Sequence, residues 1–175
     1  MSRRWIFYWI IVVASVVNYV AMVAWSLPKL QEMAGGQIPF DLRPFGYSFE
    51  EAIEFLSALG TQGREFYANT QHILDSTYPA LLAVTLIVGI LALIPGNLGR
   101  ILAGFALLGS VFDYLENWAV SALLLDDPSK LSASDVNMAS QWTVLKSIFG
   151  AIAITALLVV VLVRVIARVR AMKNA

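Results

Sequence analysis

Carboxylate and amide side chains lie close together within an otherwise apolar stretch of the sequence. Asp113, Glu116 and Asn117 stand three and four positions apart, which places them on one face of an α-helix. Acidic groups gathered in an apolar environment suit acid–base chemistry, proton transfer or the binding of a polar headgroup. The same groups also suit a hydrogen-bond network that holds helices together. The sequence leaves both interpretations open.

A second row of polar and aromatic side chains occurs earlier in the chain. Its members recur every three or four positions and so share one helix face: Arg64, Tyr67, Gln71, Asp75 and Tyr78, with His72 beside them. One histidine near one acid supplies too few ligands for a metal site, and we expect no metal. The sequence contains no phosphate-binding loop, zinc-protease motif or nucleophile elbow. It therefore predicts no cofactor and leaves open whether the protein is an enzyme.

The composition indicates the environment in which these polar groups lie. Hydrophobic residues make up 59% of the 175 residues and charged residues only 14%, whereas soluble domains carry about 25% charged residues. The chain lacks the charge for a water-facing surface, and we expect an integral membrane protein. Zero net charge argues against nucleic-acid binding, and the absence of cysteine excludes disulfides and thiolate metal sites.

Four segments are long and apolar enough to cross a membrane, since a span needs about 20 mostly apolar residues. They cover residues 5–25, 73–94, 101–125 and 142–163. The short turn between the second and third spans requires these two to be antiparallel neighbours. We therefore predict an all-α integral membrane fold, an up-down-up-down bundle of four transmembrane helices that forms one membrane domain over residues 1–175.

The distribution of charges predicts the orientation of the bundle. Seven of the twelve basic residues lie in the short segments 1–4, 95–100 and 164–175, which carry no acid. Nine of the twelve acids lie in the connections 26–72 and 126–141. Because basic residues in short loops mark the cytoplasmic side, we expect both termini to be cytoplasmic. We expect a cell membrane, most simply a bacterial inner membrane.

The first outer connection, residues 26–72, is too long for a bare loop and carries helix signals of its own. Ser48 followed by Glu51 is a capping-box pattern, and apolar residues then recur at helical spacing as far as Gly60. We predict a short amphipathic helix there, within a helical extracytoplasmic cap. Beyond Gly60 we expect the second span to extend outward as one long helix that is kinked at Pro79.

Depth along the predicted spans suggests which polar residues meet. At a rise of about 1.5 Å per residue, Asn18 lies near the depth of Asp113. The side chain of Lys146 is long enough either to reach Glu116 or to extend outward to water. Together with the second polar row, these residues predict a polar column that opens outward. Its members are Arg64, Tyr67, His72, Asp75 and Tyr78 in the outer part, with Lys146, Glu116, Asn117, Asp113 and Asn18 deeper.

Two functions fit this column best. In the first, the protein binds a membrane lipid or a small apolar or amphipathic ligand, with the headgroup in the column. In the second, it is an accessory or assembly subunit of a larger membrane complex, or part of a homo-oligomer, and the polar cluster only joins helices. A proton- or ion-conducting oligomer is disfavoured, because four spans are few and no pair of broken helices is visible.

Overall fold

The computed structural model describes residues 2–173, and this part of the chain is helical, without a β-strand. Its main elements are four long helical stretches: Arg3–Met33, Phe49–Leu93, Asn97–Leu125 and Ala133–Lys173. Each stretch is long and apolar enough to cross a membrane. The structure therefore confirms the all-α class and the number of candidate spans.

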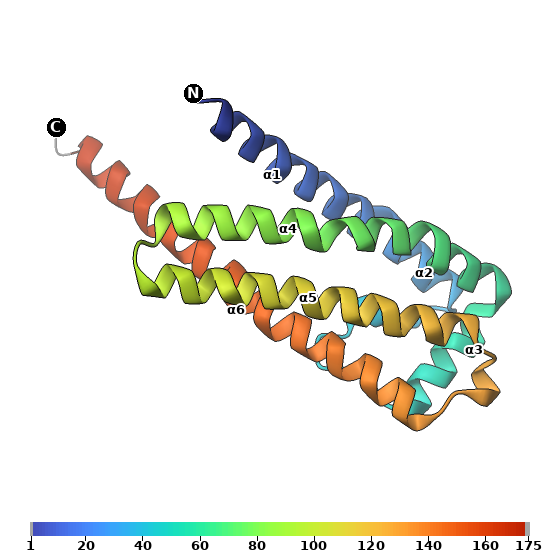
Figure 1. Cartoon of the computed structure of the whole chain (residues 1–175). Coiled ribbons are helices and arrows are strands. Elements are labelled where there is room, and N and C mark those ends of the chain that lie inside the picture. Colours follow the sequence, from blue (N-terminus) through green and yellow to red (C-terminus); the bar gives the residue numbers. More distant parts are fainter. Residues whose placement is uncertain (1, 174–175) are drawn as a thin grey trace.

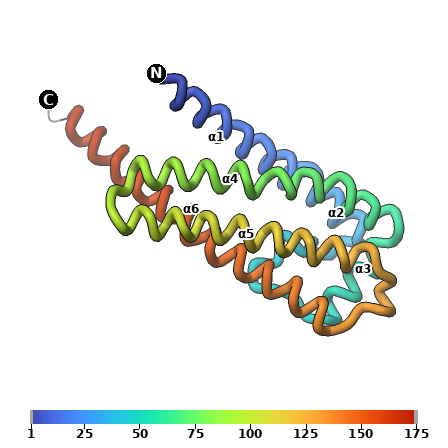
Figure 2. Tube along the Cα trace, in the orientation of Figure 1, coloured from blue at the N-terminus to red at the C-terminus, as the bar shows by residue number. Residues whose placement is uncertain are grey.

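The chain reverses direction between successive long helices, as Figure 1 and Figure 2 show. α4 (His72–Leu93) and α5 (Asn97–Leu125) are joined by a short turn and pack together. α1 (Arg3–Ala21) packs mainly on α4, and α6 (Ala133–Lys173) packs mainly on α5. Both ends of the described chain lie at the same end of the bundle as the α4–α5 turn (Figure 1). The two longer connections lie at the opposite end.

The connection between the first two long helices is folded onto the bundle. The first helix does not end near residue 25 but continues through a π-helical turn, Met22–Ser26, into α2 (Leu27–Met33). A 3₁₀ turn, Phe40–Leu42, then precedes α3 (Phe49–Phe66). We refer to the segment from α2 to the end of α3 as the cap. Its short elements are held by their packing against the ends of the long helices.

α3 begins and bends where the sequence indicated. The Ser48 hydroxyl accepts a hydrogen bond from the Glu51 N–H at 3.2 Å, and the Glu51 carboxylate accepts one from the Ser48 N–H at 2.7 Å. This geometry confirms the capping box. Gly60 interrupts the helix with a φ of +62°, a left-handed value that glycine adopts readily. A second π-helical turn, Tyr67–Gln71, then leads into α4, so the second long helix does begin well before residue 73.

The cap has an aromatic core. Phe40 is completely buried, with its ring centroid 4.4 Å from that of Tyr47 and 4.8 Å from that of Phe55. The Tyr47 N–H also donates to the Ser140 hydroxyl of α6 at 2.8 Å. Aromatic burial of this kind is among the largest single contributions to packing. The cap therefore has a defined position over one end of the bundle, and it fixes the side chains that it carries.

Candidate functional site

Pro79 determines the geometry of α4 at the level of the polar residues. Because proline has no N–H, the carbonyl four positions earlier, that of Asp75, loses its helical donor. Asn117 of α5 replaces this donor, with its Nδ2 at 3.1 Å from the Asp75 carbonyl oxygen. The predicted site residue Asn117 therefore binds the α4 backbone, and it holds Asp75 at a fixed position relative to α5.

The carbonyls on either side of this one also accept hydrogen bonds from neighbouring helices. Asn18 of α1 donates its Nδ2 to the Leu74 carbonyl at 3.0 Å. Tyr114 of α5 donates its hydroxyl to the Ser76 carbonyl at 3.0 Å. Side chains that cross between helices in this way satisfy backbone carbonyls near a proline within a helix. Asn18 thus joins α1 to α4 rather than meeting Asp113.

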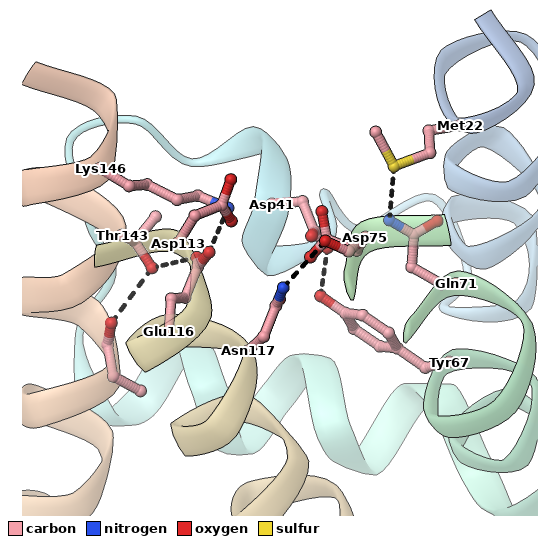
Figure 3. A network of polar contacts seen from close by, with 11 residues as sticks. Met22, Asp41, Tyr67, Gln71, Asp75, Asp113, Glu116, Asn117, Thr143 and Lys146 are labelled. Atoms are coloured by element: carbon pink, nitrogen blue, oxygen red, sulfur yellow. Dashed lines mark hydrogen bonds and ion pairs between the residues drawn. The ribbon is translucent and has the colours of Figure 1, made fainter. Parts of the chain in front are cut away.

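A buried group of charges joins α5 to α6, as Figure 3 shows. Lys146 Nζ lies 3.1 Å from Asp113 Oδ1 and also forms an ion pair with Glu116. Thr143 donates its hydroxyl to Glu116 Oε1 at 2.5 Å. Glu116 is only 1% exposed, so its partners replace water. The contact between Lys146 and Glu116 that helix depth predicted is present, and Lys146 binds Asp113 as well.

Asp41 reaches the site from the 3₁₀ turn of the cap and was not among the predicted residues. The hydroxyl of the buried Tyr67 donates a hydrogen bond to its carboxylate. The available signal was weak: Asp41 stands beside Phe40, between Pro39 and Pro44, in a segment whose apolar residues indicate packing rather than free solvation. Only the fold of the cap brings this acid to the long helices.

An elongated cavity of about 370 Å³ lies between the helices and connects these groups. Its polar end is lined by Asp41, Gln71, Asp75, Tyr78, Asp113 and Lys146. Its apolar end is lined by Leu82, Ala83, Leu86, Ala106 and Ile154. Along the second long helix, the lining runs from Gln71, at the end of the turn that precedes α4, to Leu86, about 22 Å further along. The cavity therefore has the shape and the polarity of an amphipathic molecule.

Asp75 lines this cavity with a buried carboxylate that has no partner among the described residues. It is 5% exposed, and its side chain lines the cavity wall. Among residues 2–173, no group donates a hydrogen bond or forms an ion pair to its carboxylate, since the contact from Asn117 goes to the backbone carbonyl. Burying a carboxylate without a partner is costly. The Asp75 carboxylate is therefore available to accept hydrogen bonds from a group inside the cavity.

Two π-helical turns face each other at the outer end of the cavity. Ser26, in the turn Met22–Ser26, donates its hydroxyl to Gln71 Oε1 at 2.6 Å. Gln71, in the turn Tyr67–Gln71, donates its Nε2 to the Met22 sulfur at 3.7 Å. Turns of this kind widen a helix locally and occur frequently at functional sites. Here they place Met22 and Gln71 in the cavity wall.

Two of the predicted residues, Arg64 and His72, do not line the cavity. Arg64 donates to the carbonyl of Leu56 at 3.3 Å and to that of Asp126 at 2.7 Å. The carbonyls at helix ends lack helical donors and attract guanidinium groups, which explains why Arg64 turns away. His72 Nδ1 lies 3.3 Å from the Ser121 hydroxyl. Fewer of the residues predicted for the outer part of the column therefore line the cavity than we expected.

Tyr78 closes one side of the polar end. Its ring stacks on that of Tyr19 from α1, with centroids 5.8 Å apart, and both residues line the cavity. The structure thus brings most of the predicted residues to one place. Asp75, Tyr78, Asp113 and Lys146 line the cavity, and Tyr67, Glu116 and Asn117 contact the residues or the backbone that form its wall.

Within residues 2–173, no three histidine or acidic side chains are grouped so that they would hold a metal ion. Comparison of the chain with known protein families, with curated proteins and with solved structures finds no match. Its function is therefore argued from the geometry of the cavity.

Proposed function

We propose that the protein is a multi-pass membrane protein that binds a small amphipathic molecule between its helices. The polar part of this molecule lies among the carboxylates, and its apolar part lies along α4 and α5. The observation that carries the proposal is the cavity itself, polar at one end and apolar at the other. Its volume of about 370 Å³ falls within the range of about 300–1,000 Å³ for small-molecule sites.

The outer surface of the helices supports membrane insertion. Large apolar side chains point away from the bundle, among them Phe7 (70% exposed), Val17 (62%), Leu158 (62%) and Leu162 (59%). An apolar surface of this extent is unfavourable in water, whereas lipid chains solvate it. Combined with four helices of sufficient length, it favours a chain that lies in the bilayer over one that folds in water.

The charges support an orientation with both termini in the cytoplasm. The start of α1 and the end of α6 lie at the same end of the bundle as the α4–α5 turn (Figure 1). These segments and the start of α5 carry the basic residues Arg3, Arg4, Arg100, Arg164, Arg168, Arg170 and Lys173. Short basic segments remain on the cytoplasmic side of a membrane. The cap and the polar end of the cavity then face outward, which gives the headgroup of a ligand the shorter path to the outer surface.

The interhelical interpretation accounts for only part of the site. Lys146, Asp113 and Glu116 satisfy one another and join α5 to α6, so this group needs no ligand. Asp75 differs, because its carboxylate joins no helices and faces the cavity. A group of polar residues that only holds helices together requires neither a cavity nor an acid without a partner. This difference favours ligand binding over a purely structural role.

Native mass spectrometry of the protein, extracted in a gentle detergent from its own membrane, tests the proposal. We expect a bound small molecule on the wild-type protein. The variant Ala83→Phe, which fills the apolar end of the cavity, should lose it. The matched control Ala80→Phe introduces the same ring at an exposed position of α4 and should retain it.

The result has a clear alternative. Stoichiometric protein partners, found without any small molecule on the wild type or on either variant, would identify an accessory subunit instead. Equal retention of a small molecule by Ala83→Phe and Ala80→Phe would place that molecule outside the cavity. Circular dichroism of both variants establishes that each has folded.

A further inference from the structure

We propose that the polar part of the ligand is an amine, so that the cavity takes an amphiphile with one protonated amino group and a single apolar chain. The inference rests on the proposed binding function and specifies the chemical class of the ligand.

The charges around the polar end of the cavity do not balance. Its ionisable lining residues include three acids, Asp41, Asp75 and Asp113, but only one cation, Lys146. Glu116 adds a fourth carboxylate, which pairs with the same lysine. One positive charge thus faces four acidic side chains, and an ammonium group would reduce the imbalance.

The two arginines of the cap form contacts away from the cavity. Arg43 lies over the ring of Phe40, with its guanidinium carbon 5.9 Å from the centroid, and donates to the Ile38 carbonyl at 2.9 Å. Arg64 binds helix-end carbonyls. Neither arginine lines the cavity. The excess of acid at the polar end is therefore not compensated by another basic side chain of the lining.

Lys146 is not available for an anionic headgroup. Its ammonium group already contacts Asp113 and Glu116, so a phosphate or carboxylate would have to displace an acid that is fixed on α5. The same anion would also face the carboxylates of Asp41 and Asp75, which line the same polar end. Like charges at short range repel strongly where water is scarce. The site therefore disfavours anionic heads.

An ammonium group matches what the polar end offers. It has three hydrogen-bond donors and no acceptor, and the free carboxylate of Asp75 supplies acceptors without a competing donor. Hydrogen bonds between ionised groups are about twice as strong as neutral ones. A neutral hydroxyl head would form hydrogen bonds there but would leave the charge of the acids uncompensated. Charge therefore selects the amine.

The apolar end of the cavity limits the size of the apolar part of the ligand. From Asp75 to Leu86 the cavity follows α4 for about 16 Å. Its volume of about 370 Å³ lies near the lower end of the range of about 300–1,000 Å³ for small-molecule sites. This space accommodates one medium-length alkyl chain and is too small for the two acyl chains of a phospholipid. The probe that fits is a single-chain amine such as decylamine.

Photolabelling of the full-length protein in phosphatidylcholine nanodiscs tests the inference. The probe is decylamine with a diazirine near the end of its chain, competed in turn by decylamine, decanol and decanoate, which share one chain length. We expect labels on the apolar lining, among them Leu82, Leu86 and Ile154. Decylamine should compete at least about tenfold better than decanol, because a charge-assisted hydrogen bond contributes about that factor. Decanoate should compete least.

Variants of Asp75 test whether its charge causes the preference for the amine. Asp75→Asn should weaken decylamine competition by at least about tenfold and change decanol competition by less than about twofold. Asp75→Glu keeps the carboxylate and should retain the preference for the amine. The control Glu54→Gln removes an acid at an exposed position of α3 and should change neither value.

The outcomes separate the two proposals. The amine is the wrong class of ligand if decanol or decanoate competes as well as decylamine. In that case a diazirine probe is made from the better competitor, and Ala83→Phe should still abolish its labelling. The proposed function itself fails if no probe labels the lining, or if labelling is the same in Ala83→Phe and Ala80→Phe. The comparison of the three head groups uses the wild-type protein and so does not depend on the folding of any variant.

Discussion

Lys146 is the residue on which the contact between α5 and α6 depends most. Its ammonium group bridges Asp113 and Glu116, and its side chain is only 13% exposed. Removing one partner of a buried ion pair leaves the other charge without compensation, which costs about 3–5 kcal/mol. The residue therefore stabilises the bundle independently of any ligand.

We predict that Lys146→Met lowers the free energy of unfolding by about 3–5 kcal/mol. The control Lys130→Met changes an exposed basic residue and should alter it by no more than about 0.5 kcal/mol. Thermal unfolding in detergent, followed by circular dichroism, measures both. Equal unfolding temperatures for the two variants would show that the ion pair does not stabilise the fold.

Tyr47, which lies in the cap, makes the folding stability depend on pH. Burial, and then the negative charge of Glu116, raise the pKa of its phenol well above the ordinary value of 10.0. The folded protein therefore keeps this proton at pH values where the unfolded chain loses it. By linkage, the contribution of this proton to the free energy of unfolding is fully present below about pH 10 and is lost as the pH rises above that value.

We predict that Tyr47→Phe makes the loss of stability above about pH 10 shallower. At neutral pH the variant should be close to the wild type, because the Tyr47 hydroxyl has no hydrogen-bond partner within residues 2–173. Unfolding temperatures measured across the alkaline range test both statements. Parallel curves for the two proteins would exclude Tyr47 as the group that titrates.

Sequence reasoning found residues on long helices and missed one on an irregular segment. The contact of Lys146 with Glu116 follows from depth, because both stand on regular helices whose rise is known. Asp41 stands on a 3₁₀ turn, whose position depends on the burial of Phe40 against the cap. Arg64 shares the spacing of its neighbours, yet helix-end carbonyls bind it instead. Spacing alone does not reveal such competing partners.

At the scale of elements, the proline within α4 links backbone chemistry to the site. Pro79 frees the Asp75 carbonyl, and Asn117 binds it. The same bond fixes the residue that we propose as the ligand anchor. The proline was visible in the sequence, and so was the asparagine, but their connection depends on how α4 and α5 are aligned.

We predict that Asn117 and Pro79 are energetically coupled. Asn117→Leu should destabilise the protein by about 1–3 kcal/mol, because it leaves a buried carbonyl without a donor. In a Pro79→Ala background the new N–H can supply that donor, and the same change should cost at least about 0.5 kcal/mol less. A double-mutant cycle of unfolding free energies measures the difference, and strict additivity would contradict it.

The capping box and the end of a helical segment at Gly60 were predicted correctly, since each depends on a local pattern of a few residues. The π-helical turns Met22–Ser26 and Tyr67–Gln71 were not predicted. One additional residue in a single turn leaves no distinct periodicity in the sequence, and the turns face each other through contacts between distant parts of the chain. Tertiary contacts therefore determine where the helices widen.

At the scale of the whole molecule, composition was sufficient to predict four apolar helices. It did not predict their full lengths. α6 covers Ala133–Lys173, well beyond the predicted span of residues 142–163. At about 1.5 Å per residue it is about 60 Å long, about twice the thickness of a hydrocarbon core. Hydropathy identifies only the part of such a helix that lipid would surround.

We predict that Ser57 and Asn97 lie on opposite sides of the membrane. The chain contains no cysteine, so Ser57→Cys in α3 and Asn97→Cys at the start of α5 each introduce a single thiol at an exposed position. A membrane-impermeant maleimide applied to intact cells should label Ser57→Cys alone, and both after the cells are opened. Labelling of Asn97→Cys alone in intact cells would reverse the proposed orientation.

The pairing of Lys146 with two acids of α5 has a consequence for biogenesis. A ribosome synthesises the chain from its N-terminus, so the helix that carries Asp113 and Glu116 is complete before α6 exists. Until then the two carboxylates lack the cation that pairs with them in the folded protein, and an acid at the centre of a span costs about 2.5–3.5 kcal/mol during insertion. In the proposed membrane arrangement, we therefore expect stable insertion of the third span to depend on the fourth, so that the two helices assemble as one unit.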